Sequence, residues 1–383
     1  MRFRALSLIT IALLIFYTFL CVSRLFPDHR LLSAIASTGF VIFILYMQLF
    51  HHHTKGETPL EALLAWVSSV ALGFWSSFIL FCIAIDGASL LLLIAQLLCA
   101  APDAERTYWV SEAIRFAFVA ALVTSLIGLL QAVKGPVVRK VSVLIASLPA
   151  ELAGLKIAQI SDLHIGAIIQ KEYIENIVRK VLAQSPDIIA LTGDMADGQP
   201  EALRRFTQPL AALKAPLGTY FVTGNHEYYS GAPGWIAEAQ RLGFIPLINE
   251  NRVLNYRGKN IMIAGVTDIT AHRFIPAHLS DPHKAAVTDA ACDVRILLAH
   301  QPESYRESQP AGFDLQLSGH THAGQYFPFS VLVSLVKRYA RGLHRYKTLW
   351  IYVNPGTGFW GAANRFGIPA EITLLELIKV SSE

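Results

Sequence analysis

The chain has 383 residues, which is long enough for two units with separate hydrophobic cores. Hydrophobic residues make up 53% of it and charged residues only 16%, a balance too apolar for an ordinary soluble protein of this length. The formal net charge of +4 is too small and too dispersed along the chain to indicate nucleic acid as a partner, so we expect none.

The apolar excess lies almost entirely before residue 135, in four segments that we interpret as membrane-spanning helices. Residues 5–22, 31–50 and 113–133 are each close to the ~20 residues that cross a ~30 Å hydrocarbon layer as a helix. The longer segment 60–100 is interrupted once, at Asp86 and Gly87. We expect a span near 64–86 there, with a continuation that lies at the interface or packs against the bundle.

Two features of this membrane region, 1–135, allow alternative interpretations. The first segment has the basic start of a signal peptide, but another apolar segment follows shortly after it, which favours a membrane anchor. Asp86 is a functional candidate because charges in spans are rare, and it could equally pack the bundle or mark the end of a span.

The basic residues of the short loops predict the side of the membrane on which the rest of the chain lies. With four spans, the N-terminus, the loop 51–58 and the segment after 133 share one side, which carries Arg2, Arg4, Lys55, Lys134, Arg139 and Lys140. The opposite loops carry Arg24, Arg30 and Arg106. Because cytoplasmic loops are enriched in Lys and Arg, we expect a multi-pass protein of the cell membrane with a cytoplasmic C-terminal part. A fifth span would reverse this orientation.

After a segment that we interpret as a linker, 136–152, strands and helices alternate in a second unit, 153–383. Apolar runs predict strands at 155–161, 187–193, 218–224, 261–265, 295–299, 314–318, 350–353 and 371–377. Apolar residues three and four apart predict an amphipathic helix over 171–184, and we expect another over 201–215 despite Pro209. This order predicts a parallel sheet covered by helices, with a second sheet packed on it.

Residues able to bind a metal follow five of these strands directly. They are Asp162 and His164, Asp194, Asn225 and His226, His300, and His320 and His322. Taken singly, each has a structural explanation, since an Asp after a strand is often a helix N-cap and an H-x-H pair is often a loop. Because ligand sites in open α/β sheets form outside the carboxyl ends of strands, their recurrence at successive strand ends favours a metal site.

Such a mixture of donors suits two divalent cations. Two ions held ~3.5–4 Å apart can activate a hydroxide between them and stabilise both oxygens of an in-line displacement at phosphorus. One carboxylate must bridge the two ions. Imidazoles mixed with carboxylates suit Mn, Fe or Zn better than Mg or Ca.

In order and spacing, five short motifs resemble those of the calcineurin-like metallophosphoesterase family. They are D-x-H at 162–164, G-D at 193–194, G-N-H-E at 224–227, the single His300 and G-H-T-H at 319–322. The resemblance covers about residues 153–378, and together with the N-terminal spans it is similar to a membrane-anchored branch of that family. It implies a four-layer αββα sandwich, in which two sheets lie between helices.

The same resemblance implies a role for each matched position. The first ion would be held by Asp162, His164, Asp194 and His322, and the second by Asp194 as the bridge together with Asn225, His300 and His320. His226 would contact the phosphate beside Asn225 and stabilise charge or protonate the leaving oxygen. Three carboxylates could orient these residues or could be ordinary surface groups: Asp197, Glu227 and Asp268. Ala323 departs from the branch, many members of which have glycine there.

These features predict a membrane-anchored hydrolase that cleaves a phosphoester or pyrophosphate bond by metal-activated hydroxide, with no covalent enzyme intermediate.

Segment 327–347 combines apolar and basic residues. The apolar residues are Val331, Leu332, Leu335, Val336 and Tyr339, and the basic residues are Lys337, Arg338, Arg341, Arg345 and Lys347. It could be a surface helix with a solvated basic face or an interfacial segment that presents anionic lipid to the site. The resemblance makes lipid-linked pyrophosphates such as UDP-diacylglucosamine one candidate substrate. The alternative function is a membrane sensor or scaffold whose metal-binding domain is regulatory.

Overall fold

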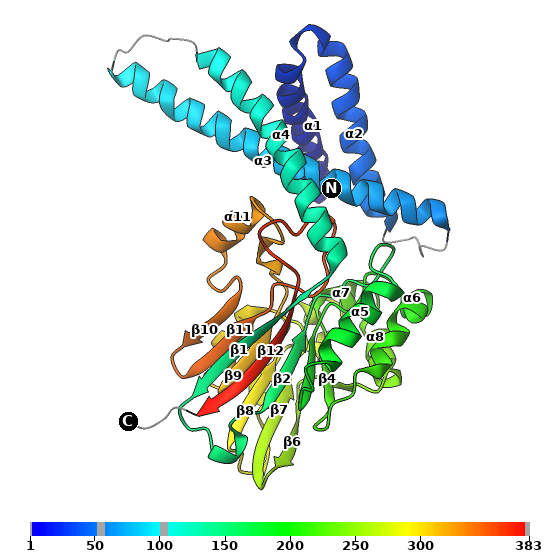
Figure 1. The fold of residues 1–383 in the computed structure, drawn as a ribbon, viewed down its shortest axis with the longest axis vertical. Coiled ribbons are helices and arrows are strands. Elements are labelled where there is room, and N and C mark those ends of the chain that lie inside the picture. The colour runs from blue at the N-terminus through cyan, green and yellow to red at the C-terminus, as the bar shows by residue number, and fades with distance from the viewer. Residues whose placement is uncertain (1, 52–57, 100–105, 380–383) are drawn as a thin grey trace.

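A computed structural model describes residues 2–51, 58–99 and 106–379 of the chain (Figure 1). Lys55, which contributes to the predicted orientation, lies outside these residues. The described chain consists of a group of long helices followed by an α/β domain.

Four helices form the N-terminal region: α1 (Arg2–Leu25), α2 (Arg30–His51), α3 (Pro59–Cys99) and α4 (Arg106–Lys134). Within the described residues, three stretches are long and apolar enough to cross a membrane, namely Pro27–Met47, Leu60–Leu97 and Tyr108–Lys134. The apolar part of α1 found there, Ile9–Leu25, is shorter. The membrane region predicted from the sequence is therefore helical, as expected.

Helix α3 contains both the span expected near 64–86 and its continuation. It is one helix of 41 residues, about 60 Å long, and it runs through Asp86 and Gly87 without a break. The Asp86 carboxylate accepts hydrogen bonds from Arg24 Nη1 at 2.7 Å and from the Tyr17 hydroxyl at 2.8 Å, both in α1. This pairing satisfies the charge, so Asp86 fastens α3 to α1, which supports the packing interpretation.

The expected linker at 136–152 is wrong, because most of it is a strand of the domain. Strand β1 (Val137–Ile145) pairs in parallel over its whole length with β12 (Glu371–Lys379). A short 3-10 helix at Ala150–Leu152 follows it. Most residues of β1 are exposed or half-buried, as in an edge strand, so the segment lacks the hydrophobic pattern of a buried strand. Its partner also lies far away in the sequence, where no local signal could reveal it.

The domain contains two six-stranded sheets. The first has the order β1-β12-β2-β3-β4-β5, in which β2 (Lys156–Ile160), β3 (Ile188–Thr192), β4 (Thr219–Val222) and β5 (Ile245–Pro246) are mutually parallel. The second has the order β10-β11-β9-β8-β7-β6. Its strands are β6 (Glu250–Tyr256), β7 (Lys259–Gly265), β8 (Val294–Leu298), β9 (Leu315–Ser318), β10 (Gly342–Tyr346) and β11 (Leu349–Val353). Of these, β7, β8, β9 and β11 run parallel.

Alternating side chains place these sheets face to face. Ile188 and Ala190 of β3 enter the core shared with the second sheet, whereas Ile189 and Leu191 face the helices on the other side. Those helices are α5 (Lys171–Leu182), α6 (Pro200–Thr207) and α8 (Ala232–Arg241), and short helices α9 (Pro282–Ala285) and α10 (Tyr305–Ser308) cover the second sheet. The predicted four-layer sandwich is therefore confirmed.

One predicted helix of the domain is shorter than expected. The segment 201–215 is α-helical only to Thr207, and a 3-10 helix follows over Gln208–Ala212. Pro209 explains the change, because its ring nitrogen has no hydrogen to donate and its ring clashes with the preceding turn.

The membrane helices pack on the end of the domain where the parallel strands terminate (Figure 1). The loop after β11 reaches both long helices: Ser69 Oγ of α3 donates to the Gly361 carbonyl at 2.5 Å, and the Arg365 N–H donates to the Gly128 carbonyl of α4 at 3.0 Å. The carboxyl ends of the strands therefore face the membrane region.

The segment 327–347 is not the single amphipathic helix that its composition suggests. Only Phe329–Val336 is helical, as α11, and β10 begins at Gly342. Tyr339, expected on the apolar face, is buried, and Lys337 pairs with Glu303 at 2.6 Å. The basic residues thus follow an apolar helix and do not share it.

Candidate metal centre

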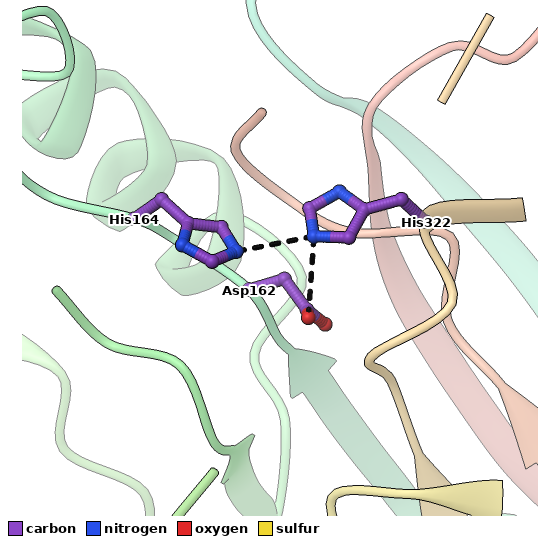
Figure 2. A group of neighbouring side chains, drawn as sticks. All are labelled: Asp162, His164 and His322. Carbon is purple, nitrogen blue, oxygen red and sulfur yellow. Dashed lines mark hydrogen bonds and ion pairs between the residues drawn. The ribbon is translucent and has the colours of Figure 1, made fainter. Parts of the chain in front are cut away.

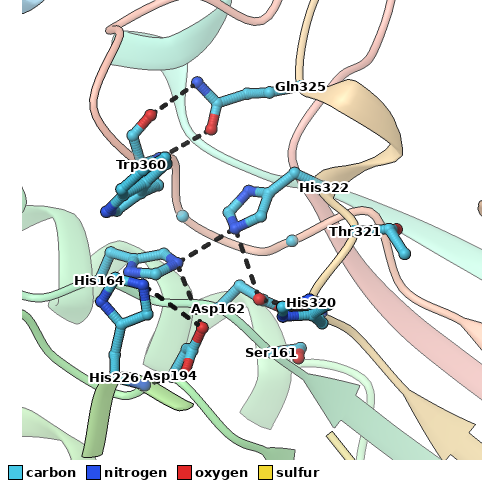
Figure 3. A network of polar contacts seen from close by, with 12 residues as sticks. Ser161, Asp162, His164, Asp194, His226, His320, Thr321, His322, Gln325 and Trp360 are labelled. Atoms are coloured by element: carbon cyan, nitrogen blue, oxygen red, sulfur yellow. Dashed lines mark hydrogen bonds and ion pairs between the residues drawn. The ribbon is translucent and has the colours of Figure 1, made fainter. Parts of the chain in front are cut away.

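The structure brings the predicted metal ligands together at one rim. Each follows the strand expected from the sequence, because β2, β3 and β4 run parallel in one sheet and β8 and β9 run parallel in the other. Asn225 and His226 open the short helix α7 (Asn225–Tyr229), and His322 opens a 3-10 helix that ends at Gly324. Figure 3 shows most of these side chains converging from both sheets.

One group of donors contains Asp162, His164 and His322 (Figure 2). Nε2 of His164 lies 3.1 Å from Nε2 of His322, which in turn lies 3.4 Å from Oδ1 of Asp162. The Asp162 carboxylate also accepts the backbone N–H of His320 at 3.0 Å. This hydrogen bond joins the end of β2 to the end of β9, so residues from both sheets make up the group.

A second group contains Asp194, His300 and His320. Nε2 of His300 lies 3.1 Å from Oδ2 of Asp194, 3.3 Å from Nδ1 of His320 and 3.2 Å from Oδ1 of Asn225. The same Asp194 oxygen is 3.9 Å from Nε2 of His164 in the first group. Asp194 therefore lies between the two groups, as a bridging ligand must.

The donor chemistry of the centre fits divalent cations. Nδ1 of His300 lies 2.8 Å from the carbonyl oxygen of Thr192, which can only accept, so the ring hydrogen belongs on Nδ1. In the neutral ring, which is the form that binds a cation, Nε2 then turns its lone pair toward the oxygens of Asp194 and Asn225. His164 is arranged in the same way, with Nδ1 3.0 Å from Oδ1 of Asp197. Lone pairs directed at one another are stabilised by a positive ion between them.

Two of the carboxylates considered from the sequence contact the candidate ligands or the turns that carry them. Asp197 faces Nδ1 of His164 at 3.0 Å and Nδ1 of His226 at 2.6 Å. Glu227 is fully buried and accepts the backbone N–H groups of Gly224 at 2.7 Å, Asp194 at 3.0 Å and Met195 at 2.7 Å. Glu227 thus fixes the turn after β3 and the turn after β4 relative to each other.

The third carboxylate considered from the sequence, Asp268, has another role. It accepts hydrogen bonds from Gln301 Nε2 at 2.9 Å and from the Thr270 N–H at 2.8 Å. Since Gln301 follows His300 directly, Asp268 steadies the chain next to a candidate ligand.

Opposing effects set the pKa values of three acidic and basic groups here. Burial alone would raise the pKa of Asp194, but the imidazoles of His300 and His226 hold it well below its usual range. Burial and the charge of Asp194 raise the pKa of Glu227 to about 7. Burial would lower the pKa of His226, but the charges of Asp197 and Asp194 raise it to about 9.

The backbone of the candidate ligands is unusual. Asp162, His164, Asp194, His320 and His322 all have φ between 47° and 68°, in the left-handed region. Such conformations cost roughly 1–3 kcal/mol each and are maintained at functional sites by the surrounding structure. Ala323 adopts the same region, with φ 51°, which explains why glycine would suit that position.

The sequence motifs do not indicate two residues beside the site, Trp360 and Arg365, which lie after β11. The exposed indole of Trp360 lies 5.7 Å from the ring of His226, and its backbone is held by Gln325 through bonds of 2.7 and 3.1 Å (Figure 3). Buried Arg365 places Nη2 3.4 Å from Nδ1 of His322. Because β11 is parallel to β9, its carboxyl end reaches the same rim, a placement that depends on strand order and on no local pattern in the sequence.

Two more exposed aromatic side chains widen this rim. The ring of Tyr229 lies 5.2 Å from that of His226 and 5.6 Å from that of Phe274. Tyr229 and Trp360 flank His226, and Phe274 extends this aromatic border behind Tyr229.

Comparison with known proteins agrees with this architecture. The family model described as calcineurin-like phosphoesterase matches residues 155–324. The chain is 39% identical over 272 residues to a bovine "Transmembrane protein with metallophosphoesterase domain", a match covering 68% of this chain and 61% of that protein. It is 39% identical over 229 residues to an "Uncharacterized metallophosphoesterase" of Helicobacter pylori, covering 58% of this chain and 60% of that one.

A third relative is matched over most of its length. An "Uncharacterized metallophosphoesterase" of Aquifex aeolicus is 32% identical over 225 residues, which cover 58% of this chain and 85% of that protein. The chain thus spans about three-fifths of the bovine and Helicobacter proteins and most of the Aquifex protein.

Proposed function

The chain belongs to the calcineurin-like phosphoesterase family, and from this premise we propose that it is a membrane-held phosphoester hydrolase with two divalent cations. The observation that carries this proposal is the position of Asp194. Its Oδ2 lies 3.1 Å from Nε2 of His300 and 3.9 Å from Nε2 of His164, between two groups of buried donors.

In this proposal, each ion has its own ligands and shares one carboxylate. Asp162, His164 and His322 would hold the first ion with Asp194, and Asn225, His300 and His320 would hold the second with Asp194. When bound, two such ions supply an activated water and neutralise charge on the phosphoryl group. Imidazole nitrogens mixed with carboxylate oxygens favour Mn, Fe or Zn.

His226 would act on the substrate and not on a cation. Its Nδ1 lies 2.6 Å from Oδ1 of Asp197, which fixes the ring and directs Nε2 toward Asp194, 4.0 Å from Oδ2. A proton carried on Nε2 can bond a phosphate oxygen or pass to the leaving oxygen. The Asn225 amide, next to it at the start of α7, would contact the same phosphate.

The substrate we propose is a phosphate or pyrophosphate carried by a lipid, for which UDP-diacylglucosamine is one example. Support comes from the position of the rim. The loop that carries Trp360 and Arg365 forms hydrogen bonds with α3 and α4. The opening of the centre therefore lies beside the membrane helices. The aromatic border of Tyr229, Phe274 and Trp360 offers apolar contact to a large substrate.

We further propose that the catalytic domain faces the cytoplasm. α1 begins and α4 ends on the side where the domain lies, which fits an even number of crossings (Figure 1). The basic residues Lys134, Arg139 and Lys140 follow directly on that side, as cytoplasmic segments commonly show.

Full-length protein in detergent, stripped of metal and reloaded with Mn, would be assayed on bis(p-nitrophenyl) phosphate and on CDP-diacylglycerol. We expect hydrolysis that needs the metal, and we expect the Asp194→Asn variant to lose both activity and the binding of two ions. Asp289→Asn, a change to an exposed carboxylate in the loop before β8, is the matched control. Undiminished hydrolysis by Asp194→Asn would refute the proposed centre.

A further inference from the structure

Helix α11 (Phe329–Val336) exposes apolar side chains to an unusual degree. Its sequence is FSVLVSLV, and none of its eight residues, all of them described, is buried. Leu335 is 78% exposed and Val336 82%, while Val331 and Leu332 are each nearly half exposed. We call these four side chains the α11 patch. Isolated apolar residues on a surface need no explanation, but a whole helix of them does.

The α11 patch continues the surface of a membrane helix. Just before it, the Tyr326 hydroxyl lies 2.7 Å from Ser76 Oγ, and the ring of Phe327 lies 5.8 Å from that of Phe81. Both Ser76 and Phe81 belong to the apolar stretch Leu60–Leu97 of α3. Figure 1 shows α11 at the end of the domain that faces the long helices. The residues that lead into α11 are therefore in direct contact with the apolar stretch of α3.

The length of α11 determines how it can meet a bilayer. Eight residues of helix extend about 12 Å, well short of the ~30 Å of a hydrocarbon core. Such a helix can lie in the plane of the interface with its apolar side chains immersed. Arg338 and Arg341 follow it and are exposed, at a place where anionic headgroups would meet them.

We propose that α11 inserts into the leaflet next to α3 as a second, in-plane membrane contact of the catalytic domain. The contact lies five residues beyond Gly324, the end of the 3-10 helix that His322 begins. Insertion therefore fixes the mouth of the metal centre at the level of the lipid headgroups. This inference concerns the membrane and stands whether or not the centre hydrolyses phosphate.

The test is site-specific photolabelling of the full chain in vesicles of phosphatidylcholine and phosphatidylglycerol. The photoreactive residue p-benzoylphenylalanine replaces Leu335 in one variant and Leu144 in the matched control. Leu144 is 48% exposed and lies near the end of β1. Because β1 starts just after α4, the length of the strand, about 25 Å, separates Leu144 from the membrane helices. Irradiated protein is then analysed by mass spectrometry for lipid adducts.

We expect lipid adducts at position 335 at least ten times as abundant as at position 144. Equal labelling at the two positions, or none at 335, would overturn the proposal. Crosslinks from 335 to a second protein chain in place of lipid would also overturn it, because a protein would then cover the patch. The same label at Leu332 supplies a second position on the helix, and it too must react with lipid.

Discussion

Replacing Gly193 with alanine tests whether the close approach of strand ends builds the second half of the metal centre. Gly193 precedes Asp194 and has φ 89°. A β-carbon there would lie 2.5 Å from Nδ1 of His300 and 2.7 Å from the backbone nitrogen of Gly224. Ordinary contacts begin near 3.4 Å, so the imidazole would have to move by about 0.9 Å.

That displacement is large on the scale of metal coordination, where ligand distances hold to about 0.2 Å. A misplacement of about 1 Å in a catalytic group costs roughly 10²-fold in rate. We therefore expect Gly193→Ala to bind the second cation at least ~100-fold more weakly and to hydrolyse bis(p-nitrophenyl) phosphate about 100-fold more slowly. Calorimetric titration with Mn and steady-state kinetics measure the two effects.

Gly243→Ala separates this clash from backbone strain. Gly243 also has φ 89°, but no described atom lies within 4 Å of the position that its β-carbon would take. Both variants should lose roughly 1–2 kcal/mol in the free energy of unfolding, because both force alanine into a left-handed conformation. Gly193→Ala should lose more than Gly243→Ala, because its β-carbon also meets the backbone of Gly224. Only Gly193→Ala should lose cation affinity. If the two variants bound Mn equally well, the steric argument would be wrong.

Three further predictions concern other parts of the site. Asp197→Asn should weaken cation binding about 10–100-fold, because the carboxylate that orients His164 and His226 is lost, and titration calorimetry would detect it. Trp360→Ala should raise KM for CDP-diacylglycerol in vesicles more than for bis(p-nitrophenyl) phosphate, because only the larger substrate reaches the aromatic border; equal changes in the two KM values would contradict this. Ala323→Gly should raise the free energy of unfolding by about 0.5–1 kcal/mol. Glycine relieves roughly 1–2 kcal/mol of backbone strain, which exceeds the entropic cost of a more flexible unfolded chain. A lower midpoint of chemical denaturation would contradict this.

Much of the site could be predicted because its signals are local. Asp162, Asp194 and His300 each follow a short apolar run, and a residue at the carboxyl end of a parallel strand reaches the ligand-binding rim of a sheet. The amphipathic helix α5 was predicted for the same reason, since its apolar spacing lies within one segment. The membrane helices follow from long apolar runs alone.

Features that join distant segments could not be predicted in this way. The sequence suggests a linker at 136–152, because β1 pairs with a strand near the other end of the chain and no local pattern reveals that pairing. Trp360 and Arg365 were overlooked, because only the order of strands in the second sheet brings the end of β11 beside His322. Helix α11 ends before the basic residues, and Tyr339 after it is buried in the domain. Both features result from packing between distant segments.

Local patterns indicate which residues could bind cations, that these residues follow strands, and that apolar helices precede the domain. The folded chain is needed to see that Asp194 lies between His164 and His300, and that the rim faces α3 and α4. The physical reason is the range of the interactions. Periodicity and strand-end position are set by neighbouring residues, whereas the meeting of two sheets and a membrane helix depends on contacts between segments far apart in the chain.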